Sequence, residues 1–424
     1  MVQALAGSYD PSKAMKRLFW AAGIVLFLVG LIGFFDRFVY GHLHAHYGSI
    51  VTWGLWVAAY IYFIGLSAGS FLISSLVYVF GVKQFEQTGR LALFTALVTL
   101  VLALLSIVLD LGHMGRAWHV MAYPNFKSPM AWMIWLYGAY MLLLAAEIWF
   151  VVRRDMVRLS GGKGLRAKFY HLLTFFCKAT TPESETRDRR VVRVLATIGV
   201  PLAIMFHGGV GALFGVVAAR PHWHSGLFPI LFVLSALVSG GALLTMVAAV
   251  FQDGWRRNSQ TVVALGQLVL GLLLLDVIFQ VSEFLVAFRG GIPGHVAGLQ
   301  LVISGPYWWV FWAWQVGVGT LAPILLLVLP TKRNPAWVSL AALLIAAGLF
   351  GMRLNIVIPG LAVEEIKGLS QAVASLRTTP HYFPSLQEFL VTIGIGGLGL
   401  LLFGLGELLL PRSSDDLEGK YVRL

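Results

Sequence analysis

The sequence predicts an all-α integral membrane protein that crosses the bilayer about ten times. Its 424 residues have a mean hydropathy of +0.81, and 58% of them are hydrophobic. Only 12% are charged, whereas a soluble domain carries about 25% charged residues. A helix needs roughly 20 apolar residues to cross the hydrocarbon core, and about ten segments of this chain qualify. These segments have no polar face to turn to water, which excludes a soluble helical core.

The expected spans follow one another along the whole chain. They cover residues 18–35, 50–80, 91–111, 130–152, 191–219, 227–251, 262–288, 307–330, 335–359 and 388–410. The basic residues of segment 13–17 lead into span 1 without a small-residue cleavage site. We therefore expect span 1 to be a retained anchor and not a cleaved signal peptide.

The basic residues sort to one side of these spans. The chain carries 31 Lys and Arg against 19 Asp and Glu, a formal net charge of +12. If the N-terminus is cytoplasmic, most basic residues fall inside, and the positive-inside rule then places both termini in the cytoplasm. We expect the basic loop 153–193 to orient the chain and to contact membrane lipid, with a partner-docking surface as the alternative. The charge excess thus indicates topology and not nucleic-acid binding.

The outer connection between spans 3 and 4 gathers polar residues in a chain that has few. It reads "DLGHMGRAWHVMAYPNFKSPMAW" and includes Asp110, His113 and Arg116. Histidines as a class favour this side, since only His171 is expected inside the cell. The groups that titrate near neutral pH therefore gather on the outer face.

Spans 4 and 5 each carry one ionisable residue with two interpretations. Glu147, near the inner end of span 4, is either the inner mouth of a proton path or an interfacial charge. His207 in span 5 is followed by glycines, which let another helix or a flat ligand approach the backbone. A lone intramembrane histidine is more often a hydrogen-bonded structural group than a ligand.

Span 7 contains a polar stripe within an apolar helix. Asp276, Gln280 and Glu283 are spaced i, i+4 and i+7, which puts them on one helical face. Ionisable residues inside spans are costly and point to function, so the stripe suggests a proton route that begins near the middle of the membrane. The alternative is a polar clamp in which each carboxylate pairs with an arginine of a neighbouring span, and the two interpretations are not exclusive.

Span 9 carries Arg353 and Asn355 near its outer end. Arg353 either snorkels to the surface as an anchor or, with Asn355, supplies hydrogen-bond donors to the outer rim. We expect both at the same depth as Glu283 and as the polar residues between spans 3 and 4. Carboxylate, imidazole and guanidinium groups at the mouth of an apolar bundle suit a ligand with an apolar body and a polar head that exchanges protons. A quinone fits this description.

Other ligand classes fit less well. A haem in a membrane cytochrome needs paired imidazoles at membrane depth, and only His207 lies that deep. Cys177 is the single cysteine, which excludes a Cys-ligated iron–sulfur cluster within the chain, and we expect no metal site. A secondary transporter or ion-conducting protein with a midplane site at Asp276 is the alternative, although the polar residues crowd the outer rim.

Several motifs together resemble the NrfD/polysulfide-reductase-type family of integral membrane subunits, which includes PsrC-like proteins. They are "WGLWVAAYIYFIGLSAGSF" (53–71), "LDLGHMGRAW" with "PNFKSPMAW" (109–132), "HGGVGALF" with "RPHWHSGLFPILFVLSALVSGGA" (207–242), "SEFLVAFRG" (282–290), "MRLNIVIPG" (352–360) and "HYFPSLQEF" (381–389). The likeness is to the long ten-span branch, which serves alternative complex III and periplasmic hydrogenase, quinone-reductase and sulfite-reductase-associated complexes.

The resemblance implies a subunit without its own redox metals that binds menaquinone or ubiquinone near the periplasmic face. A periplasmic iron–sulfur subunit would exchange electrons with that quinone in a multisubunit complex of a bacterial or archaeal cytoplasmic membrane. The implied organisation is an anchor span with its outer loop (1–49), two four-helix bundles (50–219 and 220–360), and an outer segment with the tenth span and a cytoplasmic tail (361–424).

The family motifs and the polar residues described above together suggest roles for single residues. The resemblance itself implies roles for Asp110, Arg116, Ser128, His207, Glu283, Arg353, Asn355, Tyr382 and Glu388. We expect quinone binding by Asp110, His113, Arg116, Ser128, Arg353, Asn355 and Tyr382, and proton transfer by Glu283, Asp276, Gln280, His207 and Glu147. Glu388 and Trp223 are expected to be structural or rim residues.

Overall fold

The computed structural model describes residues 11–162, 164–175, 180–252, 254–255, 258–366, 368–373 and 375–409. Cys177, segment 1–10 and the tail from 410 onward lie outside the described residues. The described part is helical and contains no strand. Ten of its helices are long and apolar enough to cross a membrane, which confirms the predicted fold class.

The ten spans are formed by the following elements. They are α2 (Pro11–Tyr40), α3 (Leu55–Tyr78), α4 (Glu86–Asp110), α6 (Pro129–Ser160), α8 (Pro182–Gly215), α9 (Phe228–Phe251), α10 (Ser259–Gly290), η3 with α12 (Val310–Leu321 and Ala322–Val328), α13 (Pro335–Ala362) and α15 (Leu386–Leu409). Short helices connect them: η1 (Lys83–Phe85), η2 (Met114–Arg116), α5 (His119–Ala122), α7 (Leu165–Leu173), α11 (Pro293–Ile303), η4 (Pro330–Arg333), α14 (Leu369–Ala372) and η5 (Leu376–Thr378).

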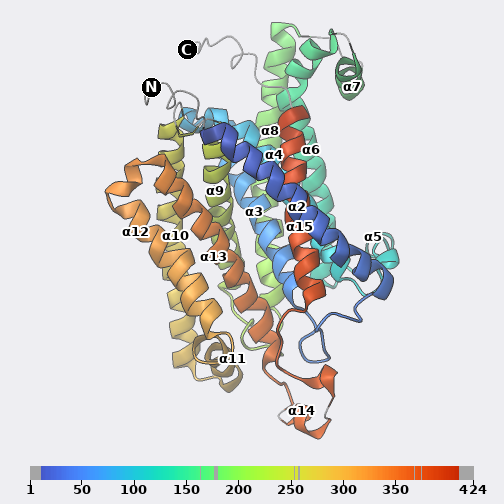
Figure 1. The fold of residues 1–424 in the computed structure, drawn as a ribbon, viewed down its shortest axis with the longest axis vertical. Helices are drawn as coiled ribbons and strands as arrows, with labels where there is room; N and C mark the ends of the chain where they lie inside the picture. The colour runs from blue at the N-terminus through green and yellow to red at the C-terminus, as the bar shows by residue number, and fades with distance from the viewer. Residues whose placement is uncertain are drawn as a thin grey trace, which may run out of the picture.

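The described ends of the chain lie together. In Figure 1, the start of α2, the end of α15 and α7 lie at the upper end of the molecule, whereas α11 and α14 lie towards the lower end. Lys16 of α2 and Glu407 of α15 form an ion pair of 2.7 Å at the upper end. The basic loop therefore shares one end of the bundle with both terminal spans.

Helix α3 is the centre of the packing. In the 18-residue apolar segment of α3, 89% of the residues are buried, against 22% in the corresponding segment of the peripheral α2. Helix α3 contacts α4, α8, α9 and α13. A Cβ placed on Gly69 of α3 would lie 1.8 Å from Ala236 O of α9. Only a residue without a side chain allows the two backbones to come this close.

Two groups of four spans pack on either side of this contact. Helices α3, α4, α6 and α8 contact one another, as do α9, α10, α13 and the span formed by η3 and α12. The close approach of α3 and α9 joins the two groups. Helices α2 and α15 pack along each other, and α15 contacts α4 at the side of the first group (Figure 1).

Ion pairs connect the helices at the basic end of the bundle. Arg153 pairs with Asp188, and both side chains are buried. Arg90 of α4 pairs with Asp155 of α6 at 2.6 Å. Part of the basic charge of this end is therefore neutralised by ion pairs.

Candidate functional site

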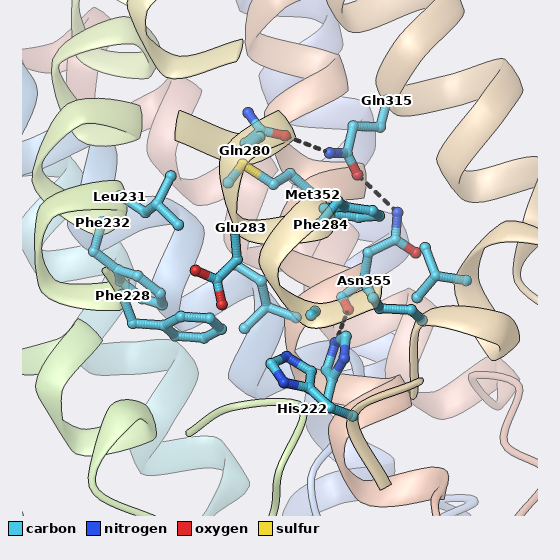
Figure 2. Close-up of a pocket in the computed structure, with 15 residues that line it drawn as sticks. His222, Phe228, Leu231, Phe232, Gln280, Glu283, Phe284, Gln315, Met352 and Asn355 are labelled. Atoms are coloured by element: carbon cyan, nitrogen blue, oxygen red, sulfur yellow. Dashed lines mark hydrogen bonds between the residues drawn. The ribbon is translucent and has the colours of Figure 1, made fainter. Parts of the chain in front are cut away.

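The second group of spans surrounds a pocket lined in part by α11, the short helix at the lower end of this group in Figure 1. Helices α9, α10, α11, η3 and α13 and the loop before α9 supply its walls, and its cavity volume is about 70 Å³. This is below the roughly 300–1,000 Å³ that is typical of ligand pockets. The apolar lining residues are Phe228, Leu231, Phe232, Phe284, Ala287, Leu299, Val302, Met352 and Ile356 (Figure 2).

One wall of the pocket carries an acid and two histidines. Ser225 Oγ donates a hydrogen bond of 2.8 Å to Glu283 Oε2. The carboxylate of Glu283 points toward Phe228 and Phe232 in Figure 2. Burial lowers the pKa of His222 to about 4, and His295 adds a smaller effect in the same direction. His222 is therefore neutral near pH 7, and its Nε2 lies 3.4 Å from Asn355 O.

A row of three side-chain amides lines the inner wall. Asn355 Nδ2 donates to Gln315 Oε1 at 2.8 Å, and Gln315 Nε2 donates to Gln280 Oε1 at 2.9 Å (Figure 2). Gln280 Nε2 in turn donates to Asp276 Oδ2 at 2.5 Å. The row connects α13, η3 and α10, and it ends at the fully buried Asp276.

A π-helix presents Gln315 to this row. Residues Val310–Leu321 form twelve residues of π-helix, a conformation that is rare and often found at functional sites. Thr320 Oγ1 donates to Gln315 O at 3.0 Å, and Trp314 Nε1 donates to Ala347 O of α13 at 2.8 Å. These bonds fix the wide turn against α13.

Behind the pocket lies a buried arginine. Arg353 is 1% exposed, donates to Ser235 Oγ at 2.6 Å and lies over the Phe232 ring at 4.7 Å. A Cβ on Gly65 would lie 3.5 Å from both Arg353 Nη2 and His207 Cε1, so the arginine and the buried histidine are close neighbours. Snorkelling is therefore wrong for Arg353, because its guanidinium points into the protein.

A second polar group lies on the first group of spans and the two terminal helices. Tyr382 accepts a hydrogen bond of 2.8 Å from Leu55 N and donates to Glu388 Oε1. Glu388 Oε2 accepts from Ser385 N at 2.8 Å. Asp110, at the end of α4, lies within electrostatic reach of Arg37 of α2. Glu388 thus holds the start of α15 against the loop before α3.

The remaining expected residues are dispersed. His113 and Arg116 are exposed and line a separate open groove beside Arg37, and Ser128 precedes α6 as its N-cap residue. Glu147 is 0% exposed on α6, and neither carboxylate oxygen hydrogen-bonds to any part of the chain that the structure describes. Glu147 therefore lies inside the bundle and not on its surface.

Trp223 is expected to be a structural or rim residue. It is 2% exposed, and its Nε1 donates a hydrogen bond of 2.7 Å to Ile356 O of α13. It holds the loop before α9 against α13.

The expectation of one shared mouth is wrong. Glu283 and Asn355 line the pocket, but Asp110, His113 and Arg116 do not. The reason is tertiary: the two sets belong to different groups of four spans, which meet where α3 packs against α9. The spacing of the polar stripe on span 7 did predict correctly that Gln280 and Glu283 share a face with Asp276.

The sequence analysis missed several residues of the pocket. Gln315 was overlooked as a single amide in an apolar run, although an unpaired amide is costly inside a span. Ser225 gave no signal, and His222 and His295 were recognised only as outer histidines. Among the described residues, no group of three or more His, Cys, Asp or Glu side chains is placed to hold a metal ion.

Comparison with known proteins identifies the family. The family model "Polysulphide reductase, NrfD" matches residues 42–364. The chain belongs to the NrfD family. The match takes in both groups of four spans and the pocket.

Relatives of this NrfD-family chain are similar over nearly its whole length. It is 37% identical to a subunit of the selenate reductase of Mesobacillus selenatarsenatis, over 94% of both chains. It is 29% identical to the Hdr-like menaquinol oxidoreductase integral membrane subunit of Archaeoglobus fulgidus, over 92% of both chains. The menaquinone reductase integral membrane subunit of Nitratidesulfovibrio vulgaris is 24% identical, over 86% of this chain and 84% of its own.

Proposed function

We propose that this NrfD-family protein is the quinone- or quinol-binding membrane subunit of a respiratory oxidoreductase complex. The observation that carries the proposal is the pocket of the second group of spans, where aromatic walls meet the Glu283 carboxylate and the amide row. Two relatives have menaquinol or menaquinone in their names, which supports the same class of ligand, menaquinone or ubiquinone.

The residues of the pocket fit a quinone head. Phe228, Phe232 and Phe284 offer flat apolar surface to a ring, and aromatic rings favour stacked or edge-on contacts of this kind. Glu283 and Asn355 place polar atoms at the margin of that surface, where the oxygens of a quinone need partners. When bound, a quinone supplies a redox reaction of two electrons and two protons.

Glu283 is the residue that we assign to proton exchange. Its carboxylate lies at the pocket wall, and Ser225 holds one of its oxygens by a hydrogen bond. The other oxygen is then oriented to take a proton from a hydroxyl or to return it. His222 is neutral near pH 7 because burial lowers its pKa to about 4, so we assign it to positioning.

The inner residues suggest that proton exchange stays at the outer rim. Gln280 and Gln315 do not titrate, and they separate the pocket from Asp276. A path onward through His207 to Glu147 remains a prediction, which a measurement of proton uptake by proteoliposomes tests. The transporter alternative needs an accessible midplane carboxylate, and Asp276 is 0% exposed and does not line the pocket.

The proposed partner is a periplasmic iron–sulfur subunit, joined by further redox subunits. It would cover the outer segments 36–49, 112–129, 220–226 and 353–387 and exchange electrons with the membrane quinone. Both termini would then lie in the cytoplasm of a bacterial or archaeal cell, on the side of the basic loop.

Purification of the intact complex tests the proposal. We expect extractable quinone, no haem attributable to this subunit, and cross-links from an iron–sulfur subunit to the four outer segments. A bis-histidine haem spectrum from this chain alone would contradict the assigned ligand. Cross-links that place the main redox partner on loop 153–193 would contradict the proposed orientation.

A further inference from the structure

Helix α7 exposes one apolar face. Leu165, Phe169 and Leu172 are spaced i, i+4 and i+7 along it, which puts them on one side of the helix. All three are exposed, from 42% for Phe169 to 88% for Leu165, and Phe175 just beyond the helix is exposed as well. With nine residues, α7 is too short to cross the hydrocarbon core, which takes roughly 20. Its apolar face therefore differs from the lipid-facing sides of the ten spans and needs its own explanation.

The opposite face of α7 is fixed to two spans. Tyr170 is buried in one cluster with Met156 of α6. Its hydroxyl donates a hydrogen bond of 2.6 Å to the carbonyl oxygen of Leu409, the last residue of α15. Trp149 Nε1 of α6 donates to Leu173 O at 2.8 Å. These contacts hold α7 in one orientation, with its apolar face turned away from α6.

The same contacts place α7 at the depth of a membrane surface. Helix α6 has 32 residues and is therefore about 48 Å long at ~1.5 Å per residue, whereas the hydrocarbon core is about 30 Å thick. The basic residues of α6 begin at Arg153, and Trp149, one turn earlier, is of a type enriched at membrane interfaces. Helix α7 packs against this stretch and against the end of α15, and Figure 1 shows it beside the upper ends of the spans.

The charges around α7 match an anionic lipid surface. Segment 161–181 contains no Asp or Glu and four basic residues: Lys163, Arg166, Lys168 and Lys178. Lys168 lies on α7 itself and is exposed. Short basic segments beside a membrane span are attracted to anionic headgroups, and a basic helix with one apolar face is typical of helices that lie in the plane of the bilayer. A partner protein would have to reach this face at the level where lipid already surrounds the bundle.

We propose that α7 is an interfacial helix that inserts Leu165, Phe169 and Leu172 into the leaflet on the side of the two described chain ends. The helix lies in the plane of the membrane, and Lys168 contacts anionic headgroups beside the inserted face. The apolar side chains reach about 5–10 Å into the boundary between headgroups and acyl chains. This surface is separate from the quinone pocket and does not depend on the proposed function.

Spin labels test the depth of this face. Phe169→Cys and Leu172→Cys are each made in a Cys177→Ser background, which removes the single native cysteine, and are labelled with a nitroxide. The full chain is placed in nanodiscs of phosphatidylcholine and phosphatidylglycerol. Collisions with oxygen, which concentrates in lipid, are compared with collisions with a water-soluble nickel chelate. We expect both labels to be reached by oxygen and protected from nickel, at a depth of about 5–10 Å.

A matched control is Glu183→Cys in the same background, since Glu183 is exposed in the first turn of α8. Its label should be reached by nickel. In nanodiscs of phosphatidylcholine alone, the two labels on α7 should lie closer to the water. An equal depth in both kinds of nanodisc would refute the preference for anionic lipid.

Three other results would overturn the insertion itself. Labels on α7 that nickel reaches as readily as the control would show a face turned to water, open to a partner protein. Labels protected from both oxygen and nickel would show a face buried against protein. Spectra broadened by a neighbouring label would show that a second copy of the chain covers it. Either α7 variant is sufficient if the other does not fold.

Discussion

Replacing Glu283 by Gln should remove most of the quinol turnover while leaving the protein folded. The amide has nearly the same shape as the carboxylate and can still accept the hydrogen bond of Ser225, which is 2.8 Å long in the structure. We therefore expect the stability to change by no more than about 1 kcal/mol. What the variant loses is the ability to take a proton.

The expected magnitude follows from that loss. General acid–base catalysis typically contributes about 10²–10⁴-fold, so kcat should fall by at least about 100-fold. The Michaelis constant should change much less, since the apolar walls that bind the ring remain. The assay is oxidation of a soluble quinol by the purified complex, with kcat and KM determined separately.

A matched control is Glu185→Gln, which alters a carboxylate at the opposite end of the bundle, where Glu185 pairs with Arg154 at 2.8 Å. Its turnover should equal that of the wild type. If Glu283→Gln keeps its kcat within a few-fold of the wild type, Glu283 is a structural partner of Ser225 and the assignment of proton exchange is refuted.

Three further predictions concern stability and assembly. Gly69→Leu should abolish assembly of the membrane subunit, because any Cβ there meets Ala236 O at 1.8 Å, whereas Gly138→Leu, where nothing lies within 4 Å, should assemble normally on a native gel. Tyr382→Phe leaves a buried backbone N–H without its acceptor and should lower the free energy of unfolding by about 1–3 kcal/mol; an unchanged thermal midpoint would contradict the hydrogen bond. Burial lowers the pKa of His222 to about 4 in the folded protein, against about 6.5 in the unfolded chain. The free energy of unfolding should therefore be highest above pH 6.5 and should fall by up to about 3 kcal/mol as the pH falls toward 4. His222→Asn should flatten that part of the curve of thermal midpoint against pH.

Local patterns in the sequence were sufficient for the spans and for the stripe on α10. Hydropathy identifies a membrane span because every backbone polar group in lipid must be paired within the helix. The helical repeat likewise places Asp276, Gln280 and Glu283 on one face without any knowledge of the neighbouring helices. Both inferences use information that lies within one segment.

The site depends on how segments pack, and there the sequence was insufficient. Asp110 and Glu283 both lie near the C-terminal ends of their helices, but these helices belong to different groups of four spans. Gln315 was missed because it is a single amide in an apolar run, and its partners Gln280 and Asn355 come from other spans. Glu388, predicted to be a structural or rim residue, accepts hydrogen bonds from the Tyr382 hydroxyl and from Ser385 N.

Locating the bound quinone is the most direct test of the proposed site. An electron cryomicroscopy map of the complex, prepared with saturating quinone, would show where the ring lies. We predict density between Phe228 and Phe284, with one oxygen within hydrogen-bonding distance of Glu283. Density confined to the groove formed by Arg37, His113 and Arg116, with none in the pocket of the second group of spans, would contradict the central claim.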